Sequence, residues 1–294
     1  MTISGRLLYA AGALLGEGPV VFPDGSLIWV DLLSGIVHSH LADKDSRVGE
    51  YEFEVSKVLP TLSGRVVFGR ELAIWEFTDG RPPIHLRLAP SGKNLRCSDA
   101  AALPNGSLVV GIVDRDLAAH GGRLVHVDVY GSVRTIAEGT TISNGIALDN
   151  DGTHAYFTDS PTQRIDVFDV DPDSGTLSAR RPFASIPSSF GTPDGLCTDA
   201  DGGVWVALWG GGRIVRLDRQ GEIDASVELP VEHVSSCAFA GQTSGQIYIT
   251  TGAVLLTEDE RRSSPGAGGL WCAETRTTGS KVFTAMEPAW ACDA

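Results

Sequence analysis

Three oxygen-bearing side chains occupy matching places in a repeated sequence pattern. Glu17, Asn144 and Asp194 each lie eight residues before the glycine of a predicted hairpin turn. Carboxylates and carboxamides are hard ligands that suit Ca²⁺, Mg²⁺ or Mn²⁺, and Zn²⁺ also accepts carboxylates. Burying two carboxylates together is costly unless a cation offsets their charge. We therefore predict one divalent cation (Ca²⁺, Mg²⁺, Mn²⁺ or Zn²⁺) held by Glu17, Asn144 and Asp194.

Each of these residues also has an ordinary interpretation. Asn144 and Asp194 each precede a glycine, and Asn-Gly and Asp-Gly are common turn dipeptides. Glu17 could be an exposed loop acid. Unrelated turns have no reason to share one register, so the common spacing favours a shared site.

The elements that position these residues recur along the whole chain. The unit is an apolar run, a turn that ends in glycine, and a second run rich in strand-forming residues. The turn glycines are Gly25, Gly64, Gly106, Gly152, Gly202 and Gly245. A spacing of roughly 40 to 50 residues and four strands per unit are typical of propeller blades. We predict an all-β fold, a six-bladed β-propeller.

The innermost strand of each blade should carry one residue at the level of the site. Counting back eight positions from each turn glycine gives Glu17, Ser56, Ser98, Asn144, Asp194 and Cys237. These residues should meet around the central tunnel. Segment 6–10 precedes the first repeat, and we expect it to add an outer strand to the last blade and close the ring. No linker is visible, so we predict a single β-propeller domain over residues 1–294.

Composition excludes several classes of partner. The formal net charge is −14 and no cluster of Lys and Arg interrupts it, which argues against nucleic acid and anionic membranes. No apolar run could span a bilayer, and the N-terminus lacks a signal-peptide pattern. The five cysteines include no CxxC pair. We expect a reduced, cytoplasmic protein, and its oligomeric state stays open.

Several motifs resemble the SMP-30/gluconolactonase family, which includes luciferin-regenerating protein. The segments that carry the resemblance are 16–19 (GEGP), 143–147 (SNGIA), 158–160 (TDS), 192–195 (TPDG) and 206–212 (VALWGGG). Their order and spacing are similar over nearly the whole chain. The resemblance implies a metal-dependent lactonase with Glu17, Asn144 and Asp194 as ligands. It also implies that Asp194 is the catalytic general base.

A substrate-binding stretch of the family differs in this sequence. The family has Arg-x-Asn-Asp-Gly, whereas residues 96–100 read RCSDA. The resemblance implies that Arg96 grips substrate oxygens and that Ser98 stands where the family has Asn. A shorter side chain at Ser98 and an alanine at Ala100 leave open which lactone is the substrate.

The favoured function is hydrolysis of a small-molecule lactone to its hydroxy acid. The cation would polarise the carbonyl, and water would be deprotonated by Asp194 or activated by the cation itself. A phosphotriesterase-like hydrolase is one alternative, because a cation polarises P=O equally well. A non-catalytic propeller, with a structural ion and a face that binds a partner, is another. Arg96 beside an open cation favours an enzyme, although fold alone does not.

Further elements could shape the mouth of the site. The segments 113–122 and 253–268 are long enough to act as lids. Trp209 could form an apolar wall or simply pack in the core. Asp159 is expected to lie behind the ligands.

Overall fold

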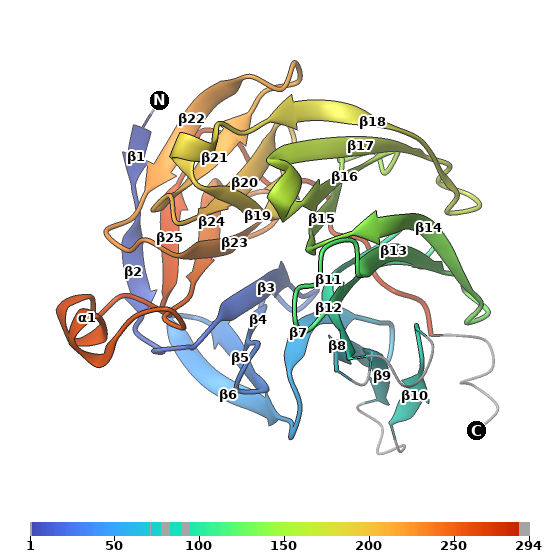
Figure 1. Ribbon diagram of the computed structural model, residues 1–294, viewed down its shortest axis with the longest axis horizontal. Helices are drawn as coiled ribbons and strands as arrows, with labels where there is room; N and C mark the ends of the chain where they lie inside the picture. The colour runs from blue at the N-terminus through green and yellow to red at the C-terminus, as the bar shows by residue number, and fades with distance from the viewer. Residues whose placement is uncertain (1, 71, 78–82, 90–93, 288–294) are drawn as a thin grey trace.

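The computed structural model describes residues 2–70, 72–77, 83–89 and 94–287. The described residues form six sheets, five of four strands and one of five. These sheets surround a central axis, which Figure 1 shows along the shortest dimension of the molecule. The predicted six-bladed propeller is thereby confirmed. In each sheet the first strand lines the axis and the fourth lies at the rim.

The blades follow chain order. Blade 1 has β3 (Gly16–Val21), β4 (Leu27–Asp31), β5 (Ile36–Leu41) and β6 (Lys44–Glu50). Blade 2 has β7 (Val55–Pro60), β8 (Gly64–Gly69), β9 (Leu72–Phe77) and β10 (Ile84–Leu86). Blade 3 has β11 (Leu95–Ala102), β12 (Leu108–Asp114), β13 (Gly122–Val127) and β14 (Val133–Thr140).

The second half of the chain repeats the arrangement. Blade 4 has β15 (Ser143–Leu148), β16 (His154–Asp159), β17 (Arg164–Val170) and β18 (Leu177–Ser185). Blade 5 has β19 (Thr192–Thr198), β20 (Val204–Trp209), β21 (Arg213–Leu217) and β22 (Ile223–Glu228). Blade 6 has β23 (Val234–Phe239), β24 (Gln246–Thr251), β25 (Leu270–Glu274) and, from the N-terminus, β2 (Arg6–Tyr9).

The N-terminal segment closes the ring. β2 pairs antiparallel with β25, as predicted for segment 6–10. The preceding strand β1 (Thr2–Ser4) was not expected, and it pairs parallel with β22 at the edge of blade 5. The N-terminus therefore connects blades 5 and 6.

Each inner strand carries a register shift at the same level. The ladder between first and second strands shifts between residues 17 and 20 in blade 1, 143 and 146 in blade 4, and 193 and 196 in blade 5. In blades 2, 3 and 6 the same ladder shifts between residues 55 and 57, 97 and 100, and 234 and 236. Such bulges redirect the chain locally and are common beside functional sites.

One position of the predicted ring, Cys237 in blade 6, is wrong. In blades 1 to 5, the residue four places before the last paired residue of the inner strand is the one that the sequence predicted for the ring. These residues are Glu17, Ser56, Ser98, Asn144 and Asp194. In blade 6 the residue at this place is Ser235, not Cys237. The turn between β23 and β24 is longer than its equivalents and Gly245 directly precedes β24, so counting back eight residues from that glycine stops two residues short of Ser235. Cys237 lies deeper, with its Sγ 3.5 Å from the Cys197 Sγ.

A short helix interrupts the loop between β24 and β25. Helix α1 (Glu258–Ser263) begins with a capping box, in which Thr257 accepts from the Glu260 N–H and the Glu260 carboxylate accepts from the Thr257 N–H. All six of its residues are exposed, so this charged run is a solvated loop tip. Among the described residues, no helix is long and apolar enough to cross a membrane.

Candidate metal and active site

The three predicted ligands come together at one end of the tunnel. Glu17, Asn144 and Asp194 lie near the start of β3, β15 and β19, which are the innermost strands of blades 1, 4 and 5 (Figure 1). Asp194 is 6% exposed, and the charges of Glu17 and Asp194 act on each other. The register argument thus brings these residues to one level of the fold.

Glu17 is held in an acidic, poorly solvated place. Burial raises its pKa to about 7, and the nearby Asp99 carboxylate adds to this shift. The Gly18 N–H, which donates to Glu17 at 3.1 Å, and the cations of Lys57 and Arg96 act in the opposite direction. The ionised carboxylate therefore lacks a full set of stabilising partners.

Burial also raises the pKa of Asp194 well above its usual range, and Glu17 and Asp99 raise it further. The Asn144 carboxamide and the Gly195 N–H only partly oppose this shift. The Oδ1 atom of Asp194 is buried and has no hydrogen-bond partner. A buried, unpaired carboxylate oxygen is costly in a structural role.

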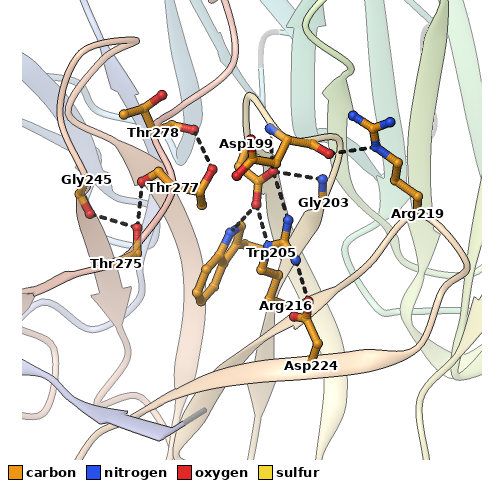
Figure 2. A network of polar contacts seen from close by, with 11 residues as sticks. Asp199, Gly203, Trp205, Arg216, Arg219, Asp224, Gly245, Thr275, Thr277 and Thr278 are labelled. Atoms are coloured by element: carbon orange, nitrogen blue, oxygen red, sulfur yellow. Dashed lines mark hydrogen bonds and ion pairs between the residues drawn. The ribbon is translucent and has the colours of Figure 1, made fainter.

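A second buried aspartate of the same blade shows the contrast. Asp199 follows β19 directly and is 0% exposed. Figure 2 shows its carboxylate accepting from the Gly203 N–H at 2.8 Å, Trp205 Nε1 at 2.9 Å and Arg216 Nε at 2.6 Å. Asp199 is thus fully paired and anchors the turn at the far end of β19, whereas Asp194 retains an oxygen free for a ligand.

The side chain of Asn144 is oriented by a hydrogen bond to Ser160. Its Nδ2 donates to Ser160 Oγ at 3.2 Å, which uses the amide nitrogen and leaves the amide oxygen as the atom available to a cation. Ser160 opens the short 3₁₀ helix η1 (Ser160–Thr162) after β16.

Two buried carboxylates fix the loops that lead into the ligand-bearing strands. Asp159 accepts from the N–H groups of Thr141 and Ile142, at 3.1 and 2.9 Å, just before β15. Asp31 accepts in the same way from the residues before β3, Leu14 and Leu15, both at 3.1 Å. Asp159 therefore lies next to the candidate ligand Asn144, opposite Ser143 in the β15–β16 ladder.

The sequence analysis missed Asp31, although a signal was present. In blades 1 and 4 an aspartate ends the second strand, 14 residues after Glu17 and 15 residues after Asn144.

The predicted substrate residues lie on β11 in blade 3. Arg96 donates from Nη1 to the Cys97 carbonyl at 2.9 Å. Burial lowers its pKa, and the negative charges of Glu54 and Glu17 oppose that shift. Ser98 occupies the bulge of β11 at the same level as the three ligands. Arg96 and Ser98 are therefore within the same acidic surroundings.

An ion pair beside the site was missed altogether. Lys57 Nζ lies 3.0 Å from Asp99 Oδ1, and both residues are buried. Asp99 also accepts from the Ala100 N–H at 2.8 Å and the Ile146 N–H at 3.0 Å. The available signal was a lysine inside the apolar strand 55–60, where a solvated face would not be expected.

The rim of the site is partly built by blades 5 and 6. Trp209 stacks on His233 with ring centroids 4.4 Å apart and 15° between planes, so it packs between the two blades and is also partly exposed. Segments 115–121 and 252–269 follow β12 and β24 and reach the same end as the ligands. Their position is compatible with a role as lids.

The residues present fit a hard divalent cation. Two carboxylates and an amide oxygen are suitable donors, and the unpartnered Oδ1 of Asp194 is the atom that most needs a counter-charge. In the part of the chain that the structure describes, no three His, Cys, Asp or Glu side chains form a metal cluster. The candidate set differs in kind, because its third member is Asn144.

Sequence comparison decides the family. Residues 15–253 match the model of the SMP-30/Gluconolactonase/LRE-like region. The chain belongs to this family.

Full-length relatives include proteins named as lactonases. A Bacillus subtilis protein with the provisional name sugar lactone lactonase YvrE is 32% identical over 279 residues, which cover 91% of this chain and 93% of that protein. Pentonolactonase XacC of Haloferax volcanii is 31% identical over 278 residues, 92% of this chain and 94% of that one. These names support a lactone-hydrolysing enzyme.

Among solved structures, a calcium-binding protein, regucalcin, from Agrobacterium tumefaciens superposes with a TM-score of 0.89 at 24% identity. The match covers 97% of this chain and 98% of that one. At this identity the likeness establishes the fold alone.

Proposed function

We propose that the protein is a divalent-metal-dependent lactonase that opens a small lactone, such as a sugar lactone, to its hydroxy acid. One observation carries the metal site: the carboxylates of the half-buried Glu17 and the buried Asp194 lie close enough for their charges to act on each other, and Asp194 retains an unpaired oxygen. The lactonase names of full-length relatives support the reaction class.

The proposed roles follow from the donor atoms. Glu17, Asn144 and Asp194 would hold the cation, which supplies Lewis acidity to a carbonyl oxygen. Asp194 would also accept the proton of the attacking water. Arg96 would orient substrate oxygens, and Ser98 would set the space available beside them. Water adds across the ring ester, the C–O bond breaks, and the alkoxide takes up a proton.

Calcium is the first cation to test. The Agrobacterium tumefaciens regucalcin is a calcium-binding protein, and oxygen-only donors suit Ca²⁺. Mg²⁺, Mn²⁺ and Zn²⁺ remain candidates, because all accept carboxylates.

A substrate panel tests the proposal. Protein treated with chelator is resupplied with Ca²⁺, Mg²⁺, Mn²⁺ or Zn²⁺ and assayed on sugar lactones, aliphatic lactones and phosphotriesters. We expect lactone hydrolysis that is lost with chelator and restored by at least one cation. Cleavage of phosphotriesters alone would favour a phosphotriesterase-like enzyme. Inactivity on every substrate, with the cation raising only thermal stability, would favour a non-catalytic binding module.

A further inference from the structure

Glu17, Ser56, Ser98, Asn144, Asp194 and Ser235 form one ring, and the positions directly after them form a second ring. They are Gly18, Lys57, Asp99, Gly145, Gly195 and Ser236. The inner strands approach closely here: a Cβ on Gly145 would lie 2.6 Å from the Asp194 carbonyl oxygen, and one on Gly195 would lie 2.2 Å from Ser236 Oγ. In this narrow ring, blades 2 and 3 alone carry charged side chains.

Those charged side chains are paired with each other. The Lys57 ammonium lies 3.0 Å from Asp99 Oδ1, and the two residues are 8% and 6% exposed. The stem of Lys57 packs against the chain next to Glu17, because a Cβ on Gly18 would lie 2.9 Å from Lys57 Cδ. The pair is therefore a fixed part of the tunnel wall rather than a surface salt bridge.

The cavity beyond this ring supplies Lys57 with no acid among its described lining residues. Its volume is about 110 Å³, and it is lined mostly by apolar side chains and bordered by segment 280–283. Among the described lining residues the charged ones are Lys57 and Lys281. The positive charge of Lys57 is therefore directed at Asp99 and at the carboxylates on the other side of the ring.

The charges of this ion pair reach the candidate ligands. Lys57 packs beside Gly18, the residue after Glu17, and Asp99 accepts from the Ile146 N–H at 3.0 Å, two residues after Asn144. A lysine and a divalent cation near the same carboxylates repel each other, and the repulsion is strong where water is excluded. Asp99 attracts the same cation.

We propose that Lys57 is a built-in counter-charge that sets how tightly the site binds its divalent cation. Its ion pair occupies Asp99, so that Glu17 and Asp194 are left as the carboxylates available to the ion. Lys57 is in this view a positioning and affinity-setting residue, not a catalytic one. The inference rests on the proposed metal site, and its test measures binding rather than turnover.

The experiment is a calorimetric titration of chelator-treated full-length protein with Ca²⁺ and with Mn²⁺ at fixed ionic strength. Lys57→Met should bind the ion about tenfold more tightly, and Asp99→Asn about tenfold more weakly. The double variant, which removes both charges, should return to within about threefold of the unchanged protein. Lys57→Arg, which keeps the charge, is the matched control and should also stay within about threefold.

Changes of the cation affinity in opposite directions in the two single variants would distinguish this role from a purely structural one. An ion pair that only stabilises the fold would lower the melting temperature of both single variants without moving the affinities in opposite directions. If the unchanged protein binds the ion and Lys57→Met binds it equally well, the inference is wrong and the proposed function stands. If the unchanged protein binds no divalent cation, both fail.

Folding of each variant is checked by circular dichroism. If Lys57→Met does not fold, the titration of Asp99→Asn tests the inference instead. Cation binding by Asp99→Asn that is unchanged or tighter would overturn the inference.

Discussion

Asp194 is the residue to which we assign both cation binding and proton transfer. Its carboxylate is buried, lies among other acids and has an unpaired oxygen. Replacing it by Asn keeps the shape and removes both the charge and the base. We expect Asp194→Asn to lose about 10²-fold to 10⁴-fold in turnover, as for the loss of a general base, and to bind the cation more weakly.

Steady-state lactone hydrolysis and calorimetry measure the two effects. Asp201→Asn is the control, since Asp201 is exposed in the turn at the far end of β19. Wild-type turnover by Asp194→Asn would contradict the assignment.

Asp159 is expected to matter through the backbone that it holds. Asp159→Ala removes the acceptor of the Thr141 and Ile142 N–H groups, and an unpaired buried donor costs about 1–3 kcal/mol. Urea unfolding should show a loss of that size. Asp151→Ala, in an exposed turn of the same blade, should change stability by less than about 0.5 kcal/mol. Equal stability of the two variants would argue against this role.

At the residue scale, the sequence was informative where one position repeats. Glu17, Asn144 and Asp194 could be found because equal spacing from a turn glycine reflects an equal place in each blade. The prediction of Cys237 for the ring was wrong because the turn between the first two strands is longer in blade 6. Lys57 and Asp99 were missed because their roles depend on contact between neighbouring blades, which spacing within one repeat does not encode.

At the scale of elements, closure depends on the N-terminus. β2 is the fourth strand of blade 6 and β1 lies parallel to β22. Deleting residues 2–9 would expose the edge of β25, and exposed edges both lose packing and promote aggregation.

We expect this deletion to lower the melting temperature far more than deletion of residues 2–4, which removes β1 alone. Calorimetry of the two truncations makes the comparison. A similar effect of both deletions would show that β2 is not the closing strand.

The elements differ in how well the sequence predicted them. Segment 6–10 was predictable, because five complete repeats and one three-stranded repeat require a strand from elsewhere. β1 has only three residues and pairs with a different blade, so no local pattern marks its partner. The capping box of α1 was present as Thr257 and Glu260 in the sequence, but six residues are too few for helical periodicity.

At the scale of the whole molecule, residues 1–294 are predicted to form one domain. A closed ring in which each blade packs on two others should unfold as one unit. We expect a single calorimetric transition. A cation at a hundredfold excess over its Kd should increase the free energy of unfolding by about 2.7 kcal/mol. Two separate transitions in the chelated protein would contradict a single domain.

The global architecture was the most predictable level, because six similar units with turn glycines admit few folds. The sequence does not encode which lactone fits, since the mouth is built from loops of several blades, among them the segment that carries α1.

The central claim is that Glu17, Asn144 and Asp194 hold one divalent cation at the tunnel end. A crystal grown with Mn²⁺ and measured for anomalous scattering tests it most directly. We predict one strong anomalous peak within bonding distance of Glu17, the amide oxygen of Asn144 and Asp194 Oδ1. An empty tunnel end, or a peak only at other residues, would contradict the account.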